Sequence, residues 1–492
     1  MKQLFALLLL MLLPVLLTAQ EKPVAQNRPL VFRNVTLIDM RSEKPQAGMS
    51  VLISTNRIAK IGRNIKIPKN AEVVDASGKF LIPGLWDMHA HSTGEKITRE
   101  IFFPLEIANG ITGIRDMFSD CYPNCSFNNG TLDDGISLEE INEWRRQSVA
   151  GTLVAPRIIA SSPLVDGLGA RWKGSLIVKD ADEGREAVRY IKRSGSDFVK
   201  VYSRLSRDAY FAIADEAKKQ NIVFAGHIPD SVTAIEASDA GQKSVEHLTG
   251  ILLAASTDET ILRSETLAWR EGKAKMSRKE IDDKILATYN DTKAVALFAR
   301  FVRNETWMCP TLTLLRGGAF LDDESFTNDA RLKYLPPSFR DDWKPANDSR
   351  FKDLTAADFA FKRKRFQKYL EIVGAMHRAG VKILAGVDGP NQFCFPGFSL
   401  HDELALLVQA QLTPFEALQT ATVNPAKYLN LTDSLGTIEK GRFADLILLD
   451  ANPLADISNT RKINAVVANG RYLSREFLDK LLSDVEAKAK MQ

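Results

Sequence analysis

The chain has 492 residues, of which 45% are hydrophobic and 26% are charged, and its formal net charge is +4. These values are typical of a globular protein and argue against a disordered or fibrous chain, and a weak net charge without a dense Lys/Arg block argues against a nucleic-acid partner. The length exceeds one ordinary domain, so we expect a barrel of roughly 250 residues or more and a second, smaller domain.

The N-terminus has the pattern of an export signal. Lys2 precedes an apolar run from Leu4 to Leu17, and the small residue Ala19 follows it, so we expect residues 1–19 to be a signal peptide that is removed. An uncleaved membrane anchor is the alternative, but the run is shorter than the ~20 apolar residues that a spanning helix needs. We therefore expect an exported protein, periplasmic or extracellular, with no stable membrane span after signal removal.

Short strand-like runs at both ends of the remaining chain predict a small β-domain. The N-terminal runs are Leu30–Asp39, Ser50–Ile61 and Glu72–Asp75, and the C-terminal runs are Ala444–Asp450 and Ala465–Gly470. Neither set is large enough to bury a core alone. We therefore expect residues 28–82 and 433–475 to pair into one composite β-sandwich.

Between these flanks, residues 83–432 alternate apolar strand-like runs with amphipathic helical stretches, which is typical of repeated βα units. The predicted fold class is α/β, with a TIM (β/α)8 barrel inserted into the β-sandwich. The candidate barrel strands are Leu85–His91, Ile111–Arg115, Arg157–Ser161, Asp197–Tyr202, Ile222–His227, Ser244–Leu248, Thr306–Leu312 and Lys382–Asp388. The long segments before the seventh and the eighth strand are expected to form a lid, or else to thicken the outer ring of helices.

Four of the six histidines fall at the ends of predicted strands. His89 and His91 are two residues apart on the first strand, so both side chains point to the same face and can reach one metal. His227 and His247 end the fifth and sixth strand-like runs, and Asp388 ends the eighth. Functional residues of such barrels lie at the carboxyl ends of the strands, and imidazoles completed by a carboxylate are a common metal-ligand set. The pattern therefore predicts a metal site.

The segments Val74–Thr93, Ala108–Met117 and Gly436–Asp450 resemble the amidohydrolase superfamily, in particular the imidazolonepropionase-like branch that includes Xaa-Pro dipeptidases. The resemblance covers nearly the whole mature chain. In that branch a lysine of the fourth strand becomes carboxylated, and Gly195–Tyr202 matches this strand at Lys200. An ammonium among metal ligands would repel the cations, whereas a carbamate is an anion that can bridge them. An unmodified lysine at the strand end is the alternative.

The resemblance implies two divalent metal ions, expected to be zinc, and a hydroxide that bridges them. The implied ligands are His89, His91 and Asp388 for one ion, His227 and His247 for the other, and carboxylated Lys200 between the two. One ion lowers the pKa of the water while the other polarises the scissile carbonyl. Asp388 is expected to act as general base and then as general acid.

Three residues are candidates for substrate binding. Tyr202 resembles a residue of this branch that hydrogen-bonds the substrate or the developing oxyanion, and a core tyrosine is an equally good interpretation. Arg171 or Arg204 can hold a substrate carboxylate bidentately, although most arginines are solvated surface residues.

Several neighbouring residues are interpreted as supporting groups. Asp87 and Asp116 follow or lie in the first two strands, and we expect them to orient ligands without binding metal. His401 is compatible with such an orienting role or with a structural role at a helix start. His377 is expected to be a surface or interface residue.

The four cysteines are too few to hold the fold together by disulfide bonds. Cys121 and Cys125 lie in a loop rich in Asn, Gly and Ser, where an oxidising compartment favours a local bridge. Cys309 and Cys394 are compatible with a bridge or with two buried thiols.

The predicted function is hydrolysis of a C–N bond in a small molecule, such as a dipeptide or an N-acyl amino acid, by a protein that is compatible with a homo-oligomer. A mononuclear deaminase or a cyclic amide hydrolase on the same fold is an alternative, and it would need one metal and no carbamate. A catalytically silent binding protein is the third interpretation, but such a chain would be expected to lose ligands.

Overall fold

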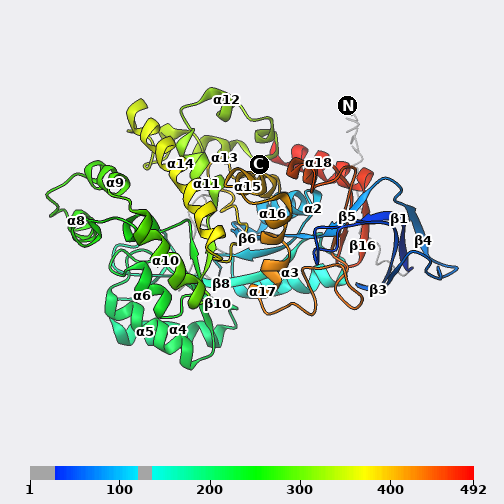
Figure 1. Cartoon of the computed structure of the whole chain (residues 1–492), viewed down its shortest axis with the longest axis horizontal. Coiled ribbons are helices and arrows are strands. Elements are labelled where there is room, and N and C mark those ends of the chain that lie inside the picture. Colours follow the sequence, from blue (N-terminus) through cyan, green and yellow to red (C-terminus); the bar gives the residue numbers. More distant parts are fainter. Residues whose placement is uncertain (1–27, 120–135, 492) are drawn as a thin grey trace, which may run out of the picture.

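The computed structural model describes residues 28–119 and 136–491 (Figure 1). The expected signal peptide, residues 1–19, and the expected Cys121–Cys125 bridge lie outside the described residues. Among the residues that are described, no helix is both long and apolar enough to cross a membrane.

Parallel strands at the centre of the molecule form the predicted barrel. Seven of them pair side by side in one sheet. They are β6 (Leu85–Ala90), β7 (Ile111–Asp116), β8 (Arg157–Asp166), β10 (Phe198–Val201), β11 (Val223–Gly226), β12 (Ser244–Glu246) and β13 (Trp307–Cys309). A short strand, β9 (Leu176–Ile177), pairs with β8 outside the ring.

The eighth predicted strand closes the barrel without forming a regular ladder. The amide of Leu384 donates to Met308 in β13, and the amide of Met88 in β6 donates to Ala385. Only isolated bridges join this segment to its neighbours, at Ile383 and Gly389. The chain leaves extended geometry at Asp388, whose φ is 66°, and such left-handed backbone interrupts strand pairing.

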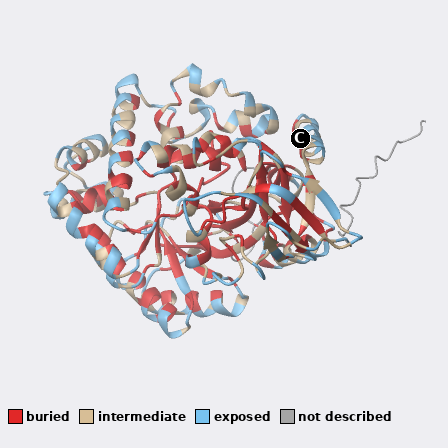
Figure 2. Cartoon of the chain, turned by 45° about the vertical axis from the view of Figure 1, so that its right-hand side comes forward, coloured by how far each residue is buried: buried red, intermediate tan, exposed pale blue. Residues whose placement is uncertain are grey.

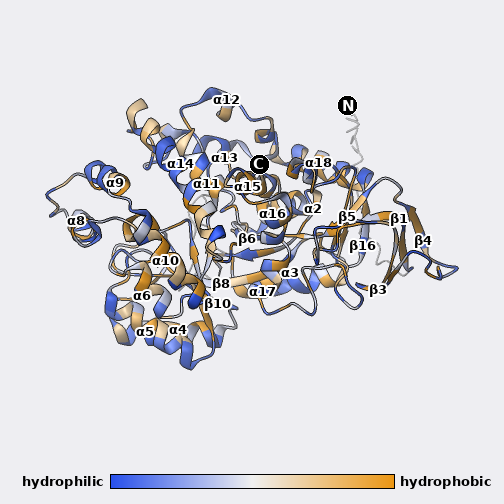
Figure 3. Ribbon diagram, viewed as in Figure 1, coloured by the Kyte–Doolittle hydropathy of each residue, from blue (hydrophilic) through white to orange (hydrophobic). Residues whose placement is uncertain are grey.

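Helices surround the barrel and turn their apolar faces inward. In α4 (Ala181–Ser194), the buried residues Ala187, Val188 and Ile191 recur at helical spacing, and the Asp180 side chain caps the helix by accepting from Glu183 N. The other helices of the outer layer are α2 (Phe103–Ala108), α3 (Leu138–Ala150), α5 (Arg207–Lys219), α6 (Ala234–Asp239), α15 (Phe398–Gln409), α16 (Pro414–Thr420) and α17 (Val423–Tyr428). Burial is concentrated in the strands and on the helix faces toward them (Figure 2), and the solvent-facing sides of the helices are largely hydrophilic (Figure 3).

Two helical insertions interrupt the βα repeat. Between β12 and β13 lie α7 (Ile251–Ala254), α8 (Glu259–Arg270), α9 (Arg278–Ala287) and α10 (Asp291–Arg303). Between β13 and the eighth segment lie α11 (Leu312–Ala319), α12 (Glu324–Thr327), α13 (Pro337–Asp342) and the long α14 (Ala356–Arg378). In Figure 1, α8 and α9 project to the left of the barrel, and α12 lies above it.

The two ends of the described chain build one separate mixed sheet, as predicted. Its strands are β1 (Leu30–Leu37), β2 (Gln46–Ser54), β3 (Arg57–Gly62), β4 (Glu72–Asp75), β5 (Phe80–Pro83), β14 (Leu446–Leu449), β15 (Ile463–Ala468) and β16 (Arg471–Ser474). The run Ser50–Ile61, predicted as one strand, is two strands, because the chain turns at Thr55 with a φ of 54°. A core of its own, which includes Phe32, Leu81 and Leu446, holds the sheet together.

The composite sheet leads directly into the first barrel strand. β5 ends at Pro83 and β6 begins at Leu85, and between them the amide of Gly84 donates to the carbonyl of Asp445. The N-terminal β-strands therefore fix the start of the strand that carries His89. After β16, α18 (Arg475–Ala489) returns to pack against α2. The sequence pattern does not predict this C-terminal helix.

Candidate metal and catalytic site

The strand ends converge on one cavity of about 480 Å³. All seven residues predicted for the site line it: His89, His91, Lys200, Tyr202, His227, His247 and Asp388. They come from β6 and β10, from the residues directly after β6, β10, β11 and β12, and from the end of the eighth segment. The volume lies in the range of small-molecule sites.

Asp388 and two histidines form a compact group at the floor of this cavity. Asp388 Oδ1 lies 2.7 Å from Nε2 of His91 and 3.2 Å from Nε2 of His89. Ligand atoms of the three side chains all lie within 4.8 Å of one another. The Nε2 atom of His89 is buried and makes no hydrogen bond within the described residues. A buried imidazole nitrogen that makes no hydrogen bond, next to a carboxylate and a second imidazole, fits a divalent cation.

His227 and His247 lie beside this group. The ring centroids of His247 and His89 are 4.4 Å apart, and those of His227 and His247 are 5.0 Å apart. Nδ1 of His227 is 2.9 Å from the Ser203 hydroxyl, and Nδ1 of His247 is 2.7 Å from the Thr311 hydroxyl. Both Nδ1 atoms are thus engaged, which leaves Nε2 of each ring for a metal.

Burial sets the charge of the site. It lowers the pKa of His89, lowers that of His227 well below its usual value, and lowers the pKa of His247 to about 3. These imidazoles are therefore neutral, which is the form that binds metals. Burial also lowers the pKa of Lys200 to about 8. Burial would raise the pKa of Asp388, but the adjacent His247 and His89 hold it well below its usual range, so Asp388 is a carboxylate.

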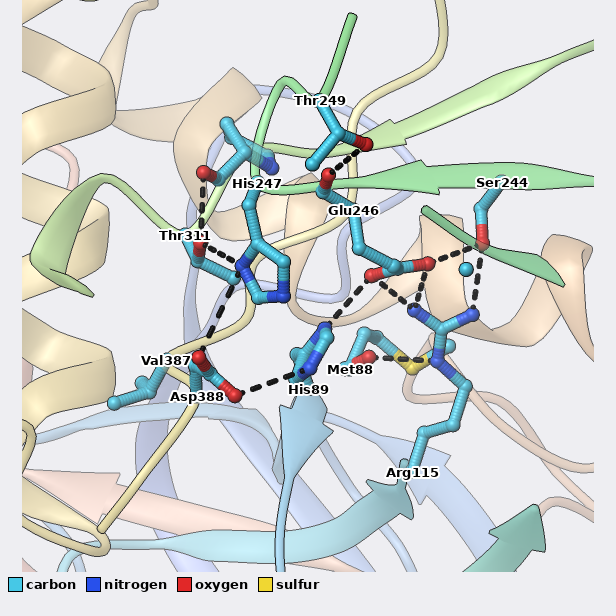
Figure 4. Close-up of polar contacts among 12 residues, drawn as sticks. Met88, His89, Arg115, Ser244, Glu246, His247, Thr249, Thr311, Val387 and Asp388 are labelled. Atoms are coloured by element: carbon cyan, nitrogen blue, oxygen red, sulfur yellow. Dashed lines mark hydrogen bonds and ion pairs between the residues drawn. The ribbon is translucent and has the colours of Figure 1, made fainter. Parts of the chain in front are cut away.

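A buried ion pair beneath the site was not predicted. Glu246 Oε2 lies 2.8 Å from Nδ1 of His89, and Arg115 Nη2 donates to both Glu246 oxygens at 2.9 Å. Figure 4 shows His89 held between Glu246 on one side and Asp388 on the other. Glu246 therefore turns the ring so that Nε2 points to Asp388. The sequence feature that points to this ion pair is the charged residue Glu246 inside the apolar run that ends at His247.

Asp87 and Asp116 support the backbone of the site, as expected, and do not line the cavity. Asp87 Oδ1 accepts from the amides of His89 and Val387, and so ties the first strand to the eighth segment. Asp116 Oδ2 accepts from the amide of Ser92, directly after His91.

Tyr202 faces the cavity beside the histidines. Its ring stacks on His227 with centroids 4.0 Å apart, and its hydroxyl accepts a hydrogen bond of 2.8 Å from Trp172 Nε1. Burial raises the pKa of Tyr202 to about 12, so the phenol keeps its proton. Because Trp172 supplies the donor, the Tyr202 proton is available to another acceptor. Trp172 was missed because it lies in the loop after β8.

The two arginines predicted as substrate-binding candidates differ in their position relative to the cavity. Arg171 lines the cavity, whereas Arg204 does not. Arg350, in the insertion before the eighth segment, also lines it and was not predicted. That insertion contributes Leu314, Asp342 and residues 347–350 to the wall, which agrees with a lid. Among the described residues 249–305, none lines the cavity. The insertion before β13 therefore thickens the outer ring.

The remaining candidates are structural. His401 is buried in α15, where Nε2 donates to the carbonyl of Asn109 at 2.9 Å and Nδ1 lies 3.0 Å from the Thr460 hydroxyl. On α14, Nε2 of His377 lies 3.0 Å from a carboxylate oxygen of Glu416. Cys309 and Cys394 are free, buried thiols.

The sequence profile of the amidohydrolase family matches residues 80–473, which span the barrel and most of the composite sheet's C-terminal strands. The chain belongs to the amidohydrolase family. Amidohydrolases generally use divalent metals, and the group formed by His89, His91 and Asp388 offers such ions a ligand set.

Relatives of this amidohydrolase share its length and fold. It is 25% identical over 499 aligned positions to the ochratoxinase of Aspergillus niger, covering 90% of this chain and 87% of the relative. The structure of a bottromycin amidohydrolase is similar with a TM-score of 0.70 at 22% identity, covering 93% of this chain and 90% of the other. A Xaa-Pro dipeptidase with methionine bound in its active site gives a TM-score of 0.62 at 19% identity, covering 91% and 100%. The amidohydrolase is thus a hydrolase that acts on carbon–nitrogen bonds.

Proposed function

We propose that this enzyme hydrolyses the amide bond of a dipeptide or an N-acyl amino acid at a site that holds two divalent metals. The observation that carries the proposal is the position of Asp388, a carboxylate in contact with His89 and His91 at the floor of the cavity. The words dipeptidase and amidohydrolase in the names of the structural neighbours support an amide substrate.

The ligands proposed for the metals are those that the sequence predicts. His89, His91 and Asp388 would hold one ion, and His227 and His247 the other, with Lys200 between them. When bound, the two ions would lower the pKa of the attacking water and polarise the scissile carbonyl. Zinc is the ion that this nitrogen-rich ligand set favours.

Lys200 is proposed to carry a carbamate. Its side chain is buried and lines the same cavity as His227 and His247. The neutral amine would form an N–C bond with carbon dioxide and release one proton, which gives an anion. An anion at this position offsets the charge of two cations that a lysine ammonium would repel.

Asp388 is proposed to move the proton. Its carboxylate accepts a proton from the water that attacks the carbonyl carbon, and then donates it to the nitrogen as the C–N bond breaks. The amine leaves, and the acyl part leaves as a carboxylate. Tyr202 would donate its phenolic proton in a hydrogen bond to the carbonyl oxygen, where negative charge develops. Phe118, Leu164 and Leu314 in the wall limit the access of water.

Metal analysis of the purified enzyme, combined with a panel of dipeptides and N-acyl amino acids, tests this proposal. We expect two metals per chain, and hydrolysis that falls by at least roughly a thousandfold in Asp388→Asn, because base and ligand are lost together. His377→Gln is the control, because His377 lies on α14 outside the cavity. One metal per chain together with release of ammonia from an aminated heterocycle would instead identify a deaminase and contradict the proposal.

Lys200 carboxylation has its own readout. Native mass spectrometry after incubation with isotope-labelled bicarbonate should show a mass gain of one carbon dioxide, absent from Lys200→Met. No labelled adduct on the active wild-type enzyme would exclude the carbamate.

Export is also proposed, from the apolar run Leu4–Leu17 and the small residue Ala19. N-terminal sequencing of the secreted protein should begin just after residue 19. A mature chain that still begins at residue 1 would contradict it.

A further inference from the structure

A second cavity of about 170 Å³ lies beside the active-site cavity. Leu314, Arg350 and Gln392 line both cavities, so the two spaces share one wall. A space of roughly 10–15 Å³ is enough for one water molecule by this measure. The second cavity therefore accommodates an organic group rather than a single solvent molecule.

Apolar side chains of α11 and α14 form most of this second cavity. Leu315 lies on α11, Phe366 and Tyr369 lie on α14, and Phe351 lies in the loop before α14. Phe351 and Phe366 are buried, and Tyr369 is partly buried. Such walls favour an aliphatic chain or an aromatic ring.

Three cations line the same space: Arg350, Lys362 and Arg365. Arg350 pairs with Asp348 at 2.5 Å, and Arg365 lies 3.8 Å from Asp282. Lys362 differs from both arginines, because within the described part of the chain no carboxylate lies within 4.0 Å of its Nζ. The Nζ atom of Lys362 lies instead 5.1 Å from the centre of the Phe351 ring.

The surroundings of Lys362 disfavour an isolated ammonium. Burial and the neighbouring Arg365 lower the pKa of Lys362 to about 8. A bound anion would offset this desolvation and the repulsion between the two cations. The cavity thus combines apolar walls with one cation that has no carboxylate partner.

The wall that the two cavities share places the second cavity next to the catalytic residues. Arg350 Nη2 donates to Gln392 Oε1 at 2.7 Å, and Gln392 Nε2 donates in turn to Asp348. This polar chain borders the active-site cavity that contains Asp388. A ligand that extended from the active site past Leu314 would reach the second cavity.

We propose that the second cavity binds the far end of the substrate, an apolar or aromatic group that ends in a carboxylate, and that Lys362 selects that carboxylate. The proposal rests on the proposed amide hydrolysis and names its substrate class. A single ammonium in apolar surroundings suits a monovalent carboxylate better than a phosphate, whose greater charge calls for several donors.

Binding of 3-phenylpropionate and its neutral analogue 3-phenylpropanamide to the metal-loaded enzyme tests this proposal by calorimetry. We expect the acid to bind at least tenfold more tightly than the amide, Lys362→Met to abolish this preference, and Lys362→Arg to restore it. Lys364→Met is the matched control, because Lys364 is exposed on the same helix and should leave both affinities unchanged.

Acid binding that is equally tight in wild type and Lys362→Met would overturn the proposal, since a carboxylate bound directly to the metals does not need Lys362. Equal binding of the acid and the amide to wild type would overturn it as well. These affinities do not depend on turnover, so an enzyme that hydrolyses no amide would refute the proposed function and leave this test intact.

Kinetics give a second readout on active enzyme. For N-acyl substrates with a carboxylate at the far end of the acyl chain, Lys362→Met should raise KM about tenfold with kcat unchanged. For the same substrates with a terminal carboxamide, KM should not change. An equal rise in KM for both sets would contradict a role in selecting charge.

Discussion

At the scale of single residues, the site depends on groups that never touch the cavity. Arg115 and Glu246 are both fully buried, and their ion pair fixes the ring of His89 through Nδ1. A buried pair is strongly destabilising when only one partner is removed, because the other charge stays uncompensated. The orientation of His89 and the stability of the barrel are therefore coupled.

Glu246→Gln should reveal this coupling. We expect the free energy of unfolding to fall by about 3–5 kcal/mol, because Arg115 loses its counter-charge. Metal affinity should fall roughly 10–100-fold, as for other groups that orient a ligand. Denaturant unfolding and a metal-competition titration measure the two effects. Glu143→Gln, in an exposed pair with Arg146 on α3, is the control, and an unchanged metal affinity in Glu246→Gln would contradict the orienting role.

Trp172→Phe tests the donor that acts on Tyr202. Without the indole N–H, the Tyr202 hydroxyl can turn away from the substrate, so kcat should fall roughly tenfold while KM changes little. Tyr202→Phe should lower kcat by roughly 100-fold or more. The double variant should be no slower than Tyr202→Phe alone. Additive losses would show that Trp172 acts independently of Tyr202.

The sequence predicts site residues whose position follows from the strand pattern. It does not predict residues that reach the site through contacts between distant segments. His89 and His91 are recognisable because alternate residues of a strand share a face, and Asp388 is recognisable because a charge follows an apolar run. Arg115 lies in β7 and Glu246 lies in β12, and their pairing depends on the register of these two strands across the barrel. Arg350 lies in an insertion, and the sequence does not predict how that insertion folds over the barrel.

At the scale of elements, strands were easier to predict than their ends. The run Thr306–Leu312 was predicted as one strand, whereas β13 ends at Cys309 and α11 begins at Leu312, after Thr311 with a φ of 47°. Left-handed residues without glycine, such as Thr311 and Thr55, have no strong sequence signal. The helix α18 lies after the last family-like motif and was missed for that reason.

His401 on α15 makes the free energy of unfolding depend on pH. Burial lowers the pKa of His401 to about 4, whereas an unfolded histidine titrates near 6.5. Above pH 6.5 both states are neutral and its contribution is complete. As pH falls from 6.5 to 4, only the unfolded state gains the proton, so stability falls by up to about 3 kcal/mol. Comparing denaturant unfolding at pH 7 and pH 4 should show a smaller loss in His401→Gln than in wild type, and an equal loss would contradict this assignment.

At the scale of the whole molecule, polar contacts join the barrel to the composite sheet. Arg157 at the start of β8 pairs with Asp445 at 2.6 Å, and its guanidinium lies 4.0 Å from the centre of the Phe443 ring. Asp445 is only 5% exposed, and its carbonyl accepts from Gly84 immediately before β6. The junction thus supports the strand that carries His89 and His91.

Arg157→Met should weaken this junction. We expect roughly 2 kcal/mol of destabilisation, less than for a fully buried pair, because Arg157 is partly exposed. Arg146→Met is the control, since it removes an exposed arginine of α3 and should change stability by less than about 0.5 kcal/mol. Thermal and denaturant unfolding compare the two, and equal stability of both variants would contradict a role for the junction.

The proposed two-metal site requires six side chains from five strand segments to hold two cations together. Anomalous diffraction at the zinc absorption edge, from crystals loaded with zinc in bicarbonate, tests this directly. We expect two peaks in the cavity, one among His89, His91 and Asp388 and one beside His227 and His247, with density for a carbamate on Lys200 between them. No peak in this cavity, or zinc bound only elsewhere on the protein, would contradict the two-metal site.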